Sequence, residues 1–226
     1  MAEASATIEV VTVNVGTPRL LARRHGAAVY SGIAKQPVPP GTVLWLSLVN
    51  LAGDSQADLS VHGGLDKAVY AYPSEHLPGW EAELGGPLGP APFGENLSTR
   101  GVTEEDVHIG DVWRWDGALL QVCQPRWPCF KLALHRDRPD VQAVMRRTGR
   151  TGFYLRVLQP GEVTVGSLID VVHNDPESLS VADAHRAMGD RHLKAPDFVR
   201  RLAAHPALAA EWREPLADRV GGSNGI

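Results

Sequence analysis

The sequence predicts a mostly β protein, a β-barrel with a few helices, followed by a small α-helical region at the C-terminus. Gly and Pro contribute 23 and 17 of the 226 residues and aromatic residues only 6%, which favours short strands joined by many turns. About ten short apolar, β-branched runs precede residue 173. Beyond residue 178 the apolar period lengthens from two to about three and a half residues, as in helices. Together these observations indicate a mostly antiparallel barrel carrying a helical piece.

The strand candidates fall into two groups. The first comprises residues 7–15, 27–33, 42–49 and 67–72, and the second comprises residues 111–115, 118–123, 153–157 and 167–172. Asp116-Gly117 separates two runs of the second group, and Asp-Gly in that position is typical of a β-hairpin turn.

Helix patterns are fewer. Residues 73–84 and 139–148 fit helices, and Gly149 is a suitable stop for the second. Ser180 with Asp183 resembles a capping box, and Pro196 and Pro206 each lie near the first turn of a further short helix. Three helices of this size cannot bury a core by themselves, so we expect them to dock on the barrel or on a partner.

This reading divides the chain into three parts. Residues 1–25 form an N-terminal extension with a basic segment at residues 19–25, residues 26–173 form the barrel domain, and residues 178–220 form the three-helix region.

The composition excludes several classes of protein. A formal net charge of −4 gives no general attraction to nucleic acid, so any basic residues that bind an anion must be concentrated locally. The sequence has no apolar span of about 18 residues and no signal-peptide pattern, so we expect a cytoplasmic protein without a membrane partner. The 2 cysteines are too few for a disulfide framework or for an iron–sulfur cluster held by this chain.

Residues 124–132 (QPRWPCFKL) are the stretch most suggestive of chemistry. Two prolines three residues apart predict a stiff loop that fixes Cys129, with Arg126 and Lys131 on either side in sequence. Neighbouring cations favour the thiolate, which is both the nucleophile and the metal ligand. A buried core thiol is the ordinary alternative, and it is the better interpretation for Cys123, which ends an apolar run.

Three further motifs are candidates for ligand binding. His62-Gly63-Gly64 with Lys67 could form an anion-binding turn, although a plain tight turn explains one Gly-Gly pair equally well. Glu95 and Asn96 after Gly94 could bind the edge of a heterocycle or simply form a turn. Arg150, between Gly149 and Gly152, suits a phosphate, whereas a helix C-cap is the alternative explanation of those glycines.

The ordered set of these motifs resembles the MOSC-domain family, named after the C-terminal domain of molybdenum-cofactor sulfurases, and in particular its YiiM-like branch with three C-terminal helices. The motifs that carry the resemblance are residues 31–35 (SGIAK), 62–70 (HGGLDKAVY), 93–97 (FGENL), 109–111 (IGD), 124–126 (QPR) with 128–129 (PC), and 149–152 (GRTG).

The resemblance implies a MOSC-type β-barrel that binds the molybdenum cofactor, a pyranopterin dithiolene with a phosphate tail. Cys129 is then the catalytic residue and the metal ligand. The residues implied to hold the phosphate and the pterin, or to orient pterin and substrate, are His62, Lys67, Arg126, Lys131, Arg150, Asn96 and Glu95, with Asp54 supporting the loop near His62.

The implied activity is the reduction of N-hydroxylated compounds, of the N-hydroxylaminopurine type. Electrons would come from an external ferredoxin-like or flavin-reductase-like donor, because no electron-transfer motif occurs in this chain. Pyridoxal phosphate binding is also associated with the family. The alternatives are a non-catalytic carrier of the cofactor or of persulfide sulfur, and a barrel that binds only a partner. The oligomeric state is open, a homodimer included.

Overall fold

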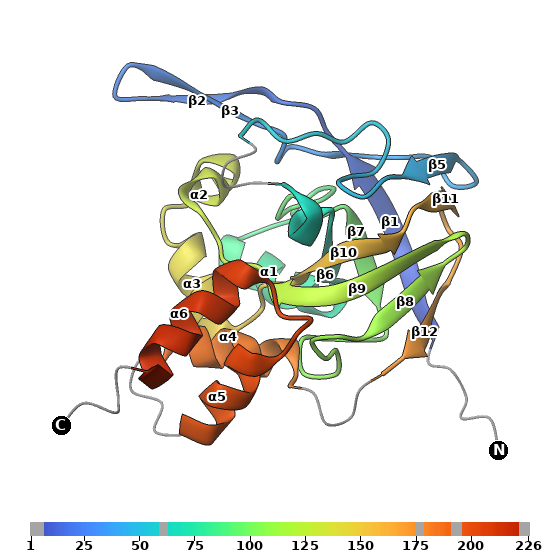
Figure 1. Ribbon diagram of the computed structural model, residues 1–226. Helices are drawn as coiled ribbons and strands as arrows, with labels where there is room; N and C mark the ends of the chain where they lie inside the picture. Colours follow the sequence, from blue (N-terminus) through green and yellow to red (C-terminus); the bar gives the residue numbers. More distant parts are fainter. Residues whose placement is uncertain (1–6, 59–62, 175–178, 191–195, 222–226) are drawn as a thin grey trace.

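The computed structural model describes residues 7–58, 63–174, 179–190 and 196–221. Within them, seven strands form a closed barrel. Their order around it is β12 (Ile169–His173), β8 (Val112–Trp115), β9 (Ala118–Pro125), β10 (Phe153–Gln159), β6 (Val69–Pro73), β7 (Leu97–Arg100) and β1 (Thr7–Val15). Pairing of β1 with β12 closes the barrel, seen at the centre of Figure 1. Neighbouring strands are antiparallel except β6 and β7, which are parallel. The predicted fold class is confirmed.

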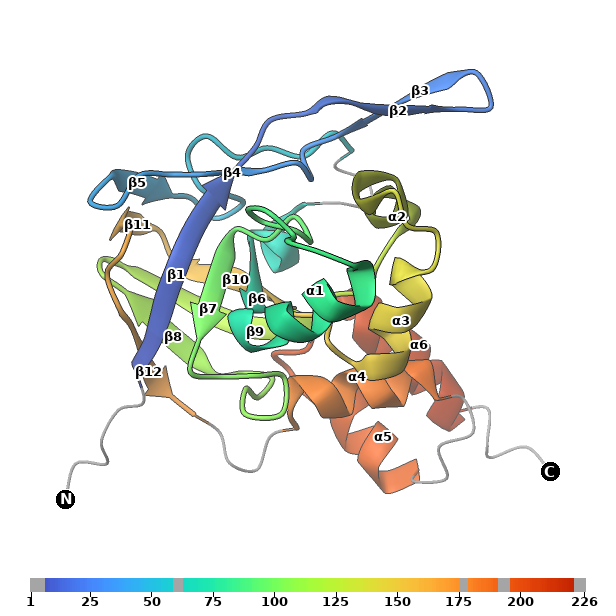
Figure 2. The ribbon, with the colours of Figure 1, turned by 180° about the vertical axis from the view of Figure 1, so that it is seen from behind.

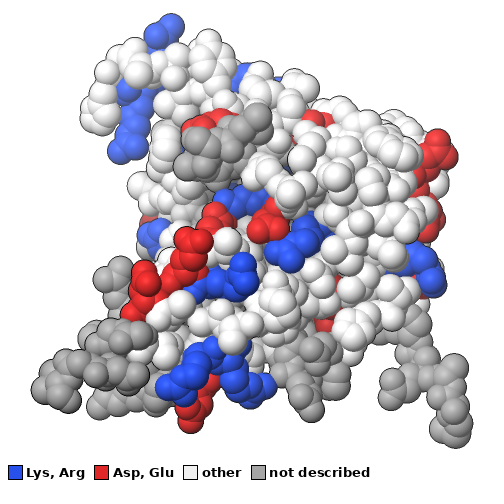
Figure 3. Space-filling model, in the orientation of Figure 1, with Lys and Arg blue, Asp and Glu red and all other residues white. Residues whose placement is uncertain are grey.

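Five shorter strands of the described residues lie outside the seven-stranded barrel. β4 (Gln36–Pro37) pairs with β1, and β5 (Val43–Leu46) pairs with β11 (Gly161–Thr164). β2 (Arg19–Arg24) and β3 (Ala27–Ser31) form a hairpin that projects away from the barrel in both ribbon views (Figures 1 and 2). Basic side chains, with no acidic ones beside them, mark this hairpin in Figure 3.

The predicted boundary at residue 25 needs correction, because β1 is a full member of the barrel and not part of an extension. Ile8, Val10 and Val13 are buried in the main core, and β1 pairs with β4, β7 and β12. The sequence of this strand alternates apolar and polar residues, as expected for a strand with one face on a core.

Strand β6 is buried on both of its faces, and this placement sets the position of the site. Val69 and Ala71 belong to the main core inside the barrel. Tyr70 and Tyr72, on the opposite face, belong to a second apolar cluster outside the barrel. That cluster includes Trp80 of α1 (Leu77–Leu84), Leu132 of α2 (Phe130–Arg136) and Met145 of α3 (Val141–Thr148).

The C-terminal helices α4 (Val181–Gly189), α5 (Pro196–Ala204) and α6 (Ala210–Gly221) dock on the barrel and share its core. Ser180 and Asp183 form the expected capping box at the start of α4. Leu202, Trp212 and Leu216 are buried in the same cluster as the barrel interior. The amide of Ala209 donates to the carbonyl of Cys123 over 3.0 Å, which ties the beginning of α6 to β9.

Several local predictions differ from the structure. Strand β9 continues to Pro125, which lies opposite Phe153, and the amide of the next residue, Arg126, donates to the Gly152 carbonyl over 3.0 Å. Proline has no amide hydrogen to donate, so it is tolerated here at the end of the strand, beyond which the Arg126 amide makes the next bond to the β10 side. Helix α2 and strands β2, β4, β7 and β11 are additional to the predicted elements, and α6 begins four residues beyond Pro206. The short 3₁₀ turns η1 (Leu65–Lys67) and η2 (Ser74–His76) flank β6.

None of the helices in the described residues is long and apolar enough to cross a membrane.

Candidate functional site

A cavity of about 570 Å³ lies on the outer side of β6 and β10, between the barrel, α2 and the C-terminal helices. Its lining brings together segments that are far apart in the sequence: the end of β3, the loops at residues 55–57 and 93–96, the loop after β9, and parts of α4 and α6. Ligand sites in proteins commonly have a volume of 300–1,000 Å³, so this cavity can hold a ligand of substantial size.

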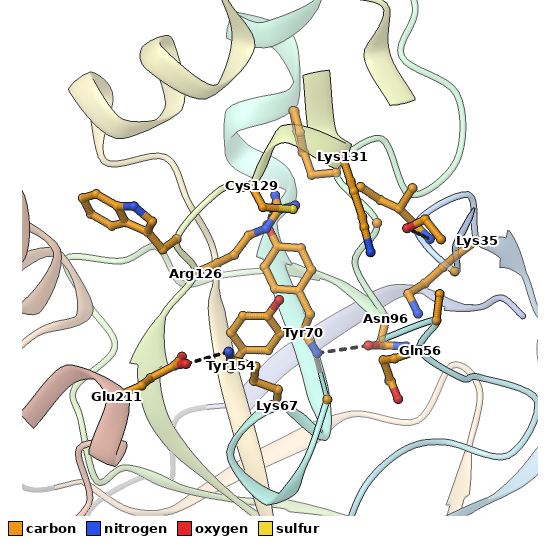
Figure 4. Close-up of a pocket in the computed structure, with 18 of the residues that line it drawn as sticks. Lys35, Gln56, Lys67, Tyr70, Asn96, Arg126, Cys129, Lys131, Tyr154 and Glu211 are labelled. Carbon is orange, nitrogen blue, oxygen red and sulfur yellow. Dashed lines mark hydrogen bonds and ion pairs between the residues drawn. The ribbon is translucent and has the colours of Figure 1, made fainter. Parts of the chain in front are cut away.

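Cys129 contributes to this cavity and is only partly buried. It is the N-cap residue of α2, with an extended backbone (φ −103°, ψ 169°), and its carbonyl accepts a 3.0 Å bond from the Leu132 amide. Strand β9 ends at Pro125, and Pro128 restricts the backbone just before Cys129, so the loop places the thiol at the cavity and not in the packed interior. Figure 4 shows its sulfur beside the Arg126 side chain.

Arg126 is a buried cation of this site that has no direct carboxylate partner among the described residues. Its guanidinium is buried (5% exposed) and lies over the Tyr70 ring at 4.9 Å, donating to the Tyr70 hydroxyl over 3.4 Å. Among the described residues it forms no ion pair with a carboxylate. Burial acts to lower the pKa of Arg126, but the neighbouring Tyr70, Tyr154 and Cys129 raise it overall. A buried cation without a carboxylate is costly, which makes this point of the cavity receptive to an anion.

Asn96 and Lys35 are held on another side of the cavity by Asp54. The Asn96 side chain donates to Asp54 over 3.0 Å and accepts from the Tyr70 amide over 3.1 Å. Lys35 forms a buried ion pair with Asp54, and burial lowers the pKa of Lys35 while the Asp54 charge opposes this. Asp54 also accepts from the Gly16 amide over 2.9 Å. This network fixes one amide and one ammonium group at the cavity wall.

Gly94 shows why glycine occurs next to Glu95 and Asn96. Its φ is +80°, and a Cβ atom at this position would lie 2.5 Å from Cγ1 of Ile33. The predicted turn therefore needs glycine both for its backbone conformation and for the close approach of the Ile33 segment.

Two further predicted cations lie in the lining. Lys67 reaches the cavity from η1 and forms an ion pair of 2.7 Å with Glu211 of α6. Lys131 reaches it from the first turn of α2. Figure 4 shows Lys131 near Cys129, and Glu211 at the side of the cavity away from Lys35.

Two predicted site residues, Glu95 and Arg150, are not brought into the cavity. Glu95 is fully buried behind it, where it accepts from the Phe93 amide over 3.0 Å, and burial raises the pKa of its carboxyl group. Arg150 packs over the Trp80 ring at 4.4 Å and pairs with Glu83, outside the lining. His62 lies outside the described residues. Glu95 and Arg150 do not line the cavity, so neither side chain is placed to contact a ligand there.

Cys123 is buried in the core, as expected from its apolar strand. Its thiol donates to the carbonyl of Asp66 over 3.2 Å, and burial raises its pKa to about 12. The two cysteines are therefore chemically distinct.

The sequence interpretation missed much of the lining. Lys35 is the last residue of the motif SGIAK, and Tyr70 is the last residue of HGGLDKAVY. Both line the cavity, although neither was predicted as a site residue. Burial raises the pKa of Tyr70 and of Tyr154, so both hydroxyl groups stay protonated and can donate hydrogen bonds. Trp127 lies within the stretch at residues 124–132 but was not assigned to the site, and Trp212 and Glu211 had no local motif that marked them as cavity residues.

This donor set suits an anionic ligand that brings its own metal ligands. Within the described part of the chain, no group of three or more His, Cys, Asp and Glu side chains could hold a metal ion. One cysteine sulfur beside a buried arginine can instead complete the coordination of a soft metal whose other ligands arrive with a cofactor.

The structure is a β-barrel with one large cavity whose lining includes a thiol and several cations. The family model for the MOSC domain matches residues 58–170, and the chain belongs to the MOSC-domain family.

The relatives place it beside the YiiM proteins. Protein YiiM of Escherichia coli (strain K12) is 43% identical over 218 residues, covering 92% of this chain and 91% of YiiM. The crystal structure of YiiM from Geobacillus stearothermophilus superposes with a TM-score of 0.78 at 36% identity, over 94% of this chain and 99% of that one. A protein named reductase from Gibberella moniliformis (strain M3125 / FGSC 7600) is 34% identical over 189 residues, which are 81% of this chain and 33% of that protein.

Proposed function

We propose that this protein is a molybdenum-cofactor-dependent reductase of N-hydroxylated compounds, with the metal held by the Cys129 thiolate. The observation that carries the proposal is the shared cavity in which Cys129 lies beside Arg126, a buried guanidinium that forms no ion pair with a carboxylate of the described residues. Membership of the MOSC family, and the relative named reductase, support the same reading.

The cations of the cavity fit a cofactor with a phosphate tail. Arg126, Lys131 and Lys35 surround the hollow, and of these only Lys35 forms an ion pair within the described residues. Hydrogen bonds to a charged group contribute about 1.5–3 kcal/mol each, so a phosphate bound here would be held by several such contacts. Pyridoxal phosphate would satisfy the same cations, but it would make no use of Cys129, so the molybdenum cofactor accounts for more of the cavity.

When bound, the cofactor supplies the two-electron chemistry that, with two protons, converts an N–OH group into N–H and water. The chain supplies the rest. Cys129 would hold the metal, and Asn96 lines the cavity with an amide whose N–H groups are held by Asn14 and Asp54. The Tyr70 hydroxyl donates to the Thr151 carbonyl over 2.7 Å, whereas the protonated Tyr154 hydroxyl can donate into the cavity. These contacts orient the ligands and displace water from the reacting atoms.

This chain holds no iron–sulfur cluster of its own, because 2 cysteines, one of them in the core, are too few. We propose a ferredoxin-like or flavin-reductase-like donor, as a separate chain. The fungal relative is consistent with this arrangement, since its matching region is joined to a much longer chain.

The decisive experiment compares Cys129→Ala with Cys123→Ala, each purified from a host that makes the cofactor. We expect Cys129→Ala to fold, to lose molybdenum and to lose at least about 100-fold in N-hydroxylamine reduction driven by a chemical reductant, because even second-shell changes at metal sites cost 10–100-fold. Cys123→Ala, the matched control, should keep both its metal and its activity.

Full activity in Cys129→Ala would overturn the assignment. Wild-type protein that holds molybdenum and pterin, yet reduces no N-hydroxylated compound with a chemical reductant, would instead identify a cofactor carrier.

A further inference from the structure

The β2–β3 hairpin contributes no residue to the packing of the barrel. None of residues 19–30 belongs to either apolar cluster of the described chain. A two-stranded hairpin is only marginally stable by itself in water, so this one depends on contacts at the barrel surface. The Arg19 guanidinium donates to the Ala34 carbonyl, and the Arg24 guanidinium lies 5.2 Å from the centre of the Phe130 ring in α2. The hairpin is therefore held in place without serving the core.

The hairpin lies in a stretch of the chain that has no acidic residue. Residues 10–53 contain no Asp or Glu, and their Lys and Arg residues are Arg19, Arg23, Arg24 and Lys35, in a chain whose formal net charge is −4. The three hairpin arginines are exposed, and none of them forms an ion pair with an Asp or Glu of the described residues. Figure 3 shows their positive charge at the projecting end of the molecule. Such a local excess of positive charge attracts an acidic partner.

The same hairpin also exposes apolar side chains. Leu20 and Tyr30 are 50% and 54% exposed, and they lie directly opposite each other on β2 and β3. Opposite residues of an antiparallel pair share one face, so the two side chains form one apolar spot among the arginines. Tyr and Arg are the residue types most enriched at the energetic centres of protein–protein interfaces. The composition of the hairpin is thus that of a protein-docking surface.

The hairpin is continuous with the rim of the cavity that contains Cys129. Residues 31–33, at the end of β3 and directly after it, line the cavity. Phe130, which Arg24 contacts, is the residue that follows Cys129 in the chain. Both ribbon views show the hairpin extending past α2 (Figures 1 and 2). A protein that docks on the hairpin and α2 therefore lies beside the proposed metal ligand.

The positive charge of the hairpin and that of the cavity act on the same helix. Burial, together with the charges of Arg136, Arg126 and Arg19, lowers the pKa of His135 in α2 to about 4. Arg19 belongs to the hairpin and Arg126 to the cavity, so their fields overlap at α2. One positive region thus extends from the projecting strands to the cavity.

We propose that the β2–β3 hairpin and the first turn of α2 form the docking surface for an acidic redox protein. This partner, a reduced iron–sulfur or flavin protein, is oxidised by two electrons, which with two protons convert the N–OH group into N–H and water. An acidic surface complements the unpaired arginines, and docking here shortens the distance that the electrons travel to the cavity. The inference rests on the proposed function, and it adds where the donor binds and what charge it carries.

Equilibrium binding tests the docking surface without turnover. Two acidic redox proteins serve as probes, a plant-type ferredoxin and a flavodoxin, and each is titrated in its oxidised form into the cofactor-loaded protein by calorimetry at low and at high salt. Arg23→Glu/Arg24→Glu reverses the charge of the hairpin. Arg146→Glu/Arg147→Glu, which reverses an equally exposed pair of adjacent arginines on α3, is the matched control. Tyr30→Ser removes the exposed ring.

We expect at least one probe to bind the wild type at low salt and to dissociate at high salt, because salt screens exposed charges. The hairpin double variant should bind at least about 10-fold more weakly, since like charges across an interface oppose binding. Tyr30→Ser should also bind more weakly, and the α3 variant should bind as wild type does. All variants should unfold cooperatively and keep their molybdenum. Arg23→Gln retains the contact of Arg24 with Phe130, so it repeats the comparison if the double variant does not fold.

Failure of both probes to bind the wild type, or equal affinity in the wild type and the hairpin variants, would overturn the docking surface. A single-stranded RNA is titrated in parallel. Binding of RNA through Arg23 and Arg24, without binding of either acidic protein, would identify a nucleic-acid surface and would also overturn the proposal.

The two proposals fail separately. Probe binding that depends on the hairpin arginines, in a protein that reduces no N–OH compound with dithionite, would leave the docking surface standing and remove the reductase. Dithionite-driven reduction in a protein that binds neither probe would do the reverse.

Discussion

Two loops lie side by side at one end of the β9–β10 pair, and each carries an arginine that the sequence assigned to the cofactor. The loop at residues 126–129 and the loop at residues 149–152 are joined by the bond from the Arg126 amide to the Gly152 carbonyl. Yet Arg126 enters the cavity without a carboxylate partner, whereas Arg150 turns the other way, onto Trp80 and Glu83.

The difference shows that the surroundings of a cation, and not its neighbours in sequence, decide whether it is available to a ligand. Arg150 is satisfied within the protein by an aromatic face and a carboxylate. Arg126 has a phenol ring and a hydroxyl group beside it, and it feels the charge of the buried Glu95, but it forms no ion pair with a carboxylate of the described residues. Arg150 therefore stabilises the fold, and Arg126 is available to an anion.

Replacing Arg126 by Met should produce a larger effect than replacing Arg150, and the effect should be a loss of bound cofactor. Molybdenum retained after gel filtration should drop about 10- to 100-fold, because a charged contact contributes about 1.5–3 kcal/mol. The free energy of unfolding of the cofactor-free protein should change by less than about 1 kcal/mol, since an uncompensated buried charge is removed with its hydrogen bonds. Metal analysis and urea denaturation check the two parts. Wild-type metal retention together with a large loss of stability would show that Arg126 is structural.

Replacing Arg150 by Met should reverse this pattern. Molybdenum content should equal that of wild type, whereas the free energy of unfolding should fall by about 1–2 kcal/mol through loss of the contact with Trp80 and of the partly exposed ion pair. The same two measurements apply. Loss of metal in Arg150→Met, without loss of stability, would return this arginine to the site.

The fold was largely predictable because its determinants are local. Four features are each determined by a few neighbouring residues: the alternation of β1, the Asp116-Gly117 turn, the Ser180 capping box and the end of α3 at Gly149. The predictions failed where distant pairing decides the outcome. β11 is a strand because β5 lies opposite it, and β1 belongs to the barrel because β12 and β7 flank it.

The site was only half predictable, for the same reason. Cys129, Arg126 and Lys131 belong to one short stretch, residues 124–132, and all three line the cavity. Lys67 was found, but its partner Glu211 lies 144 residues away and carries no motif. Likewise Glu83, which captures Arg150, lies 67 residues before it, so no local pattern could place that arginine outside the cavity.

The two cysteines provide the smallest and most selective test of the difference between cavity and core. Because burial raises the pKa of Cys123 to about 12, its thiol should be almost entirely protonated at pH 8, with roughly one molecule in ten thousand ionised. Its thiolate fraction should grow only as the pH approaches that value, so iodoacetamide should modify one cysteine per native, cofactor-free chain. Mass spectrometry should find the label on Cys129, with no labelling in Cys129→Ala and unchanged labelling in Cys123→Ala. Comparable labelling of Cys123 at pH 8 would mean that the β9 segment opens to solvent, and the separation of a reactive thiol from a structural one would be lost.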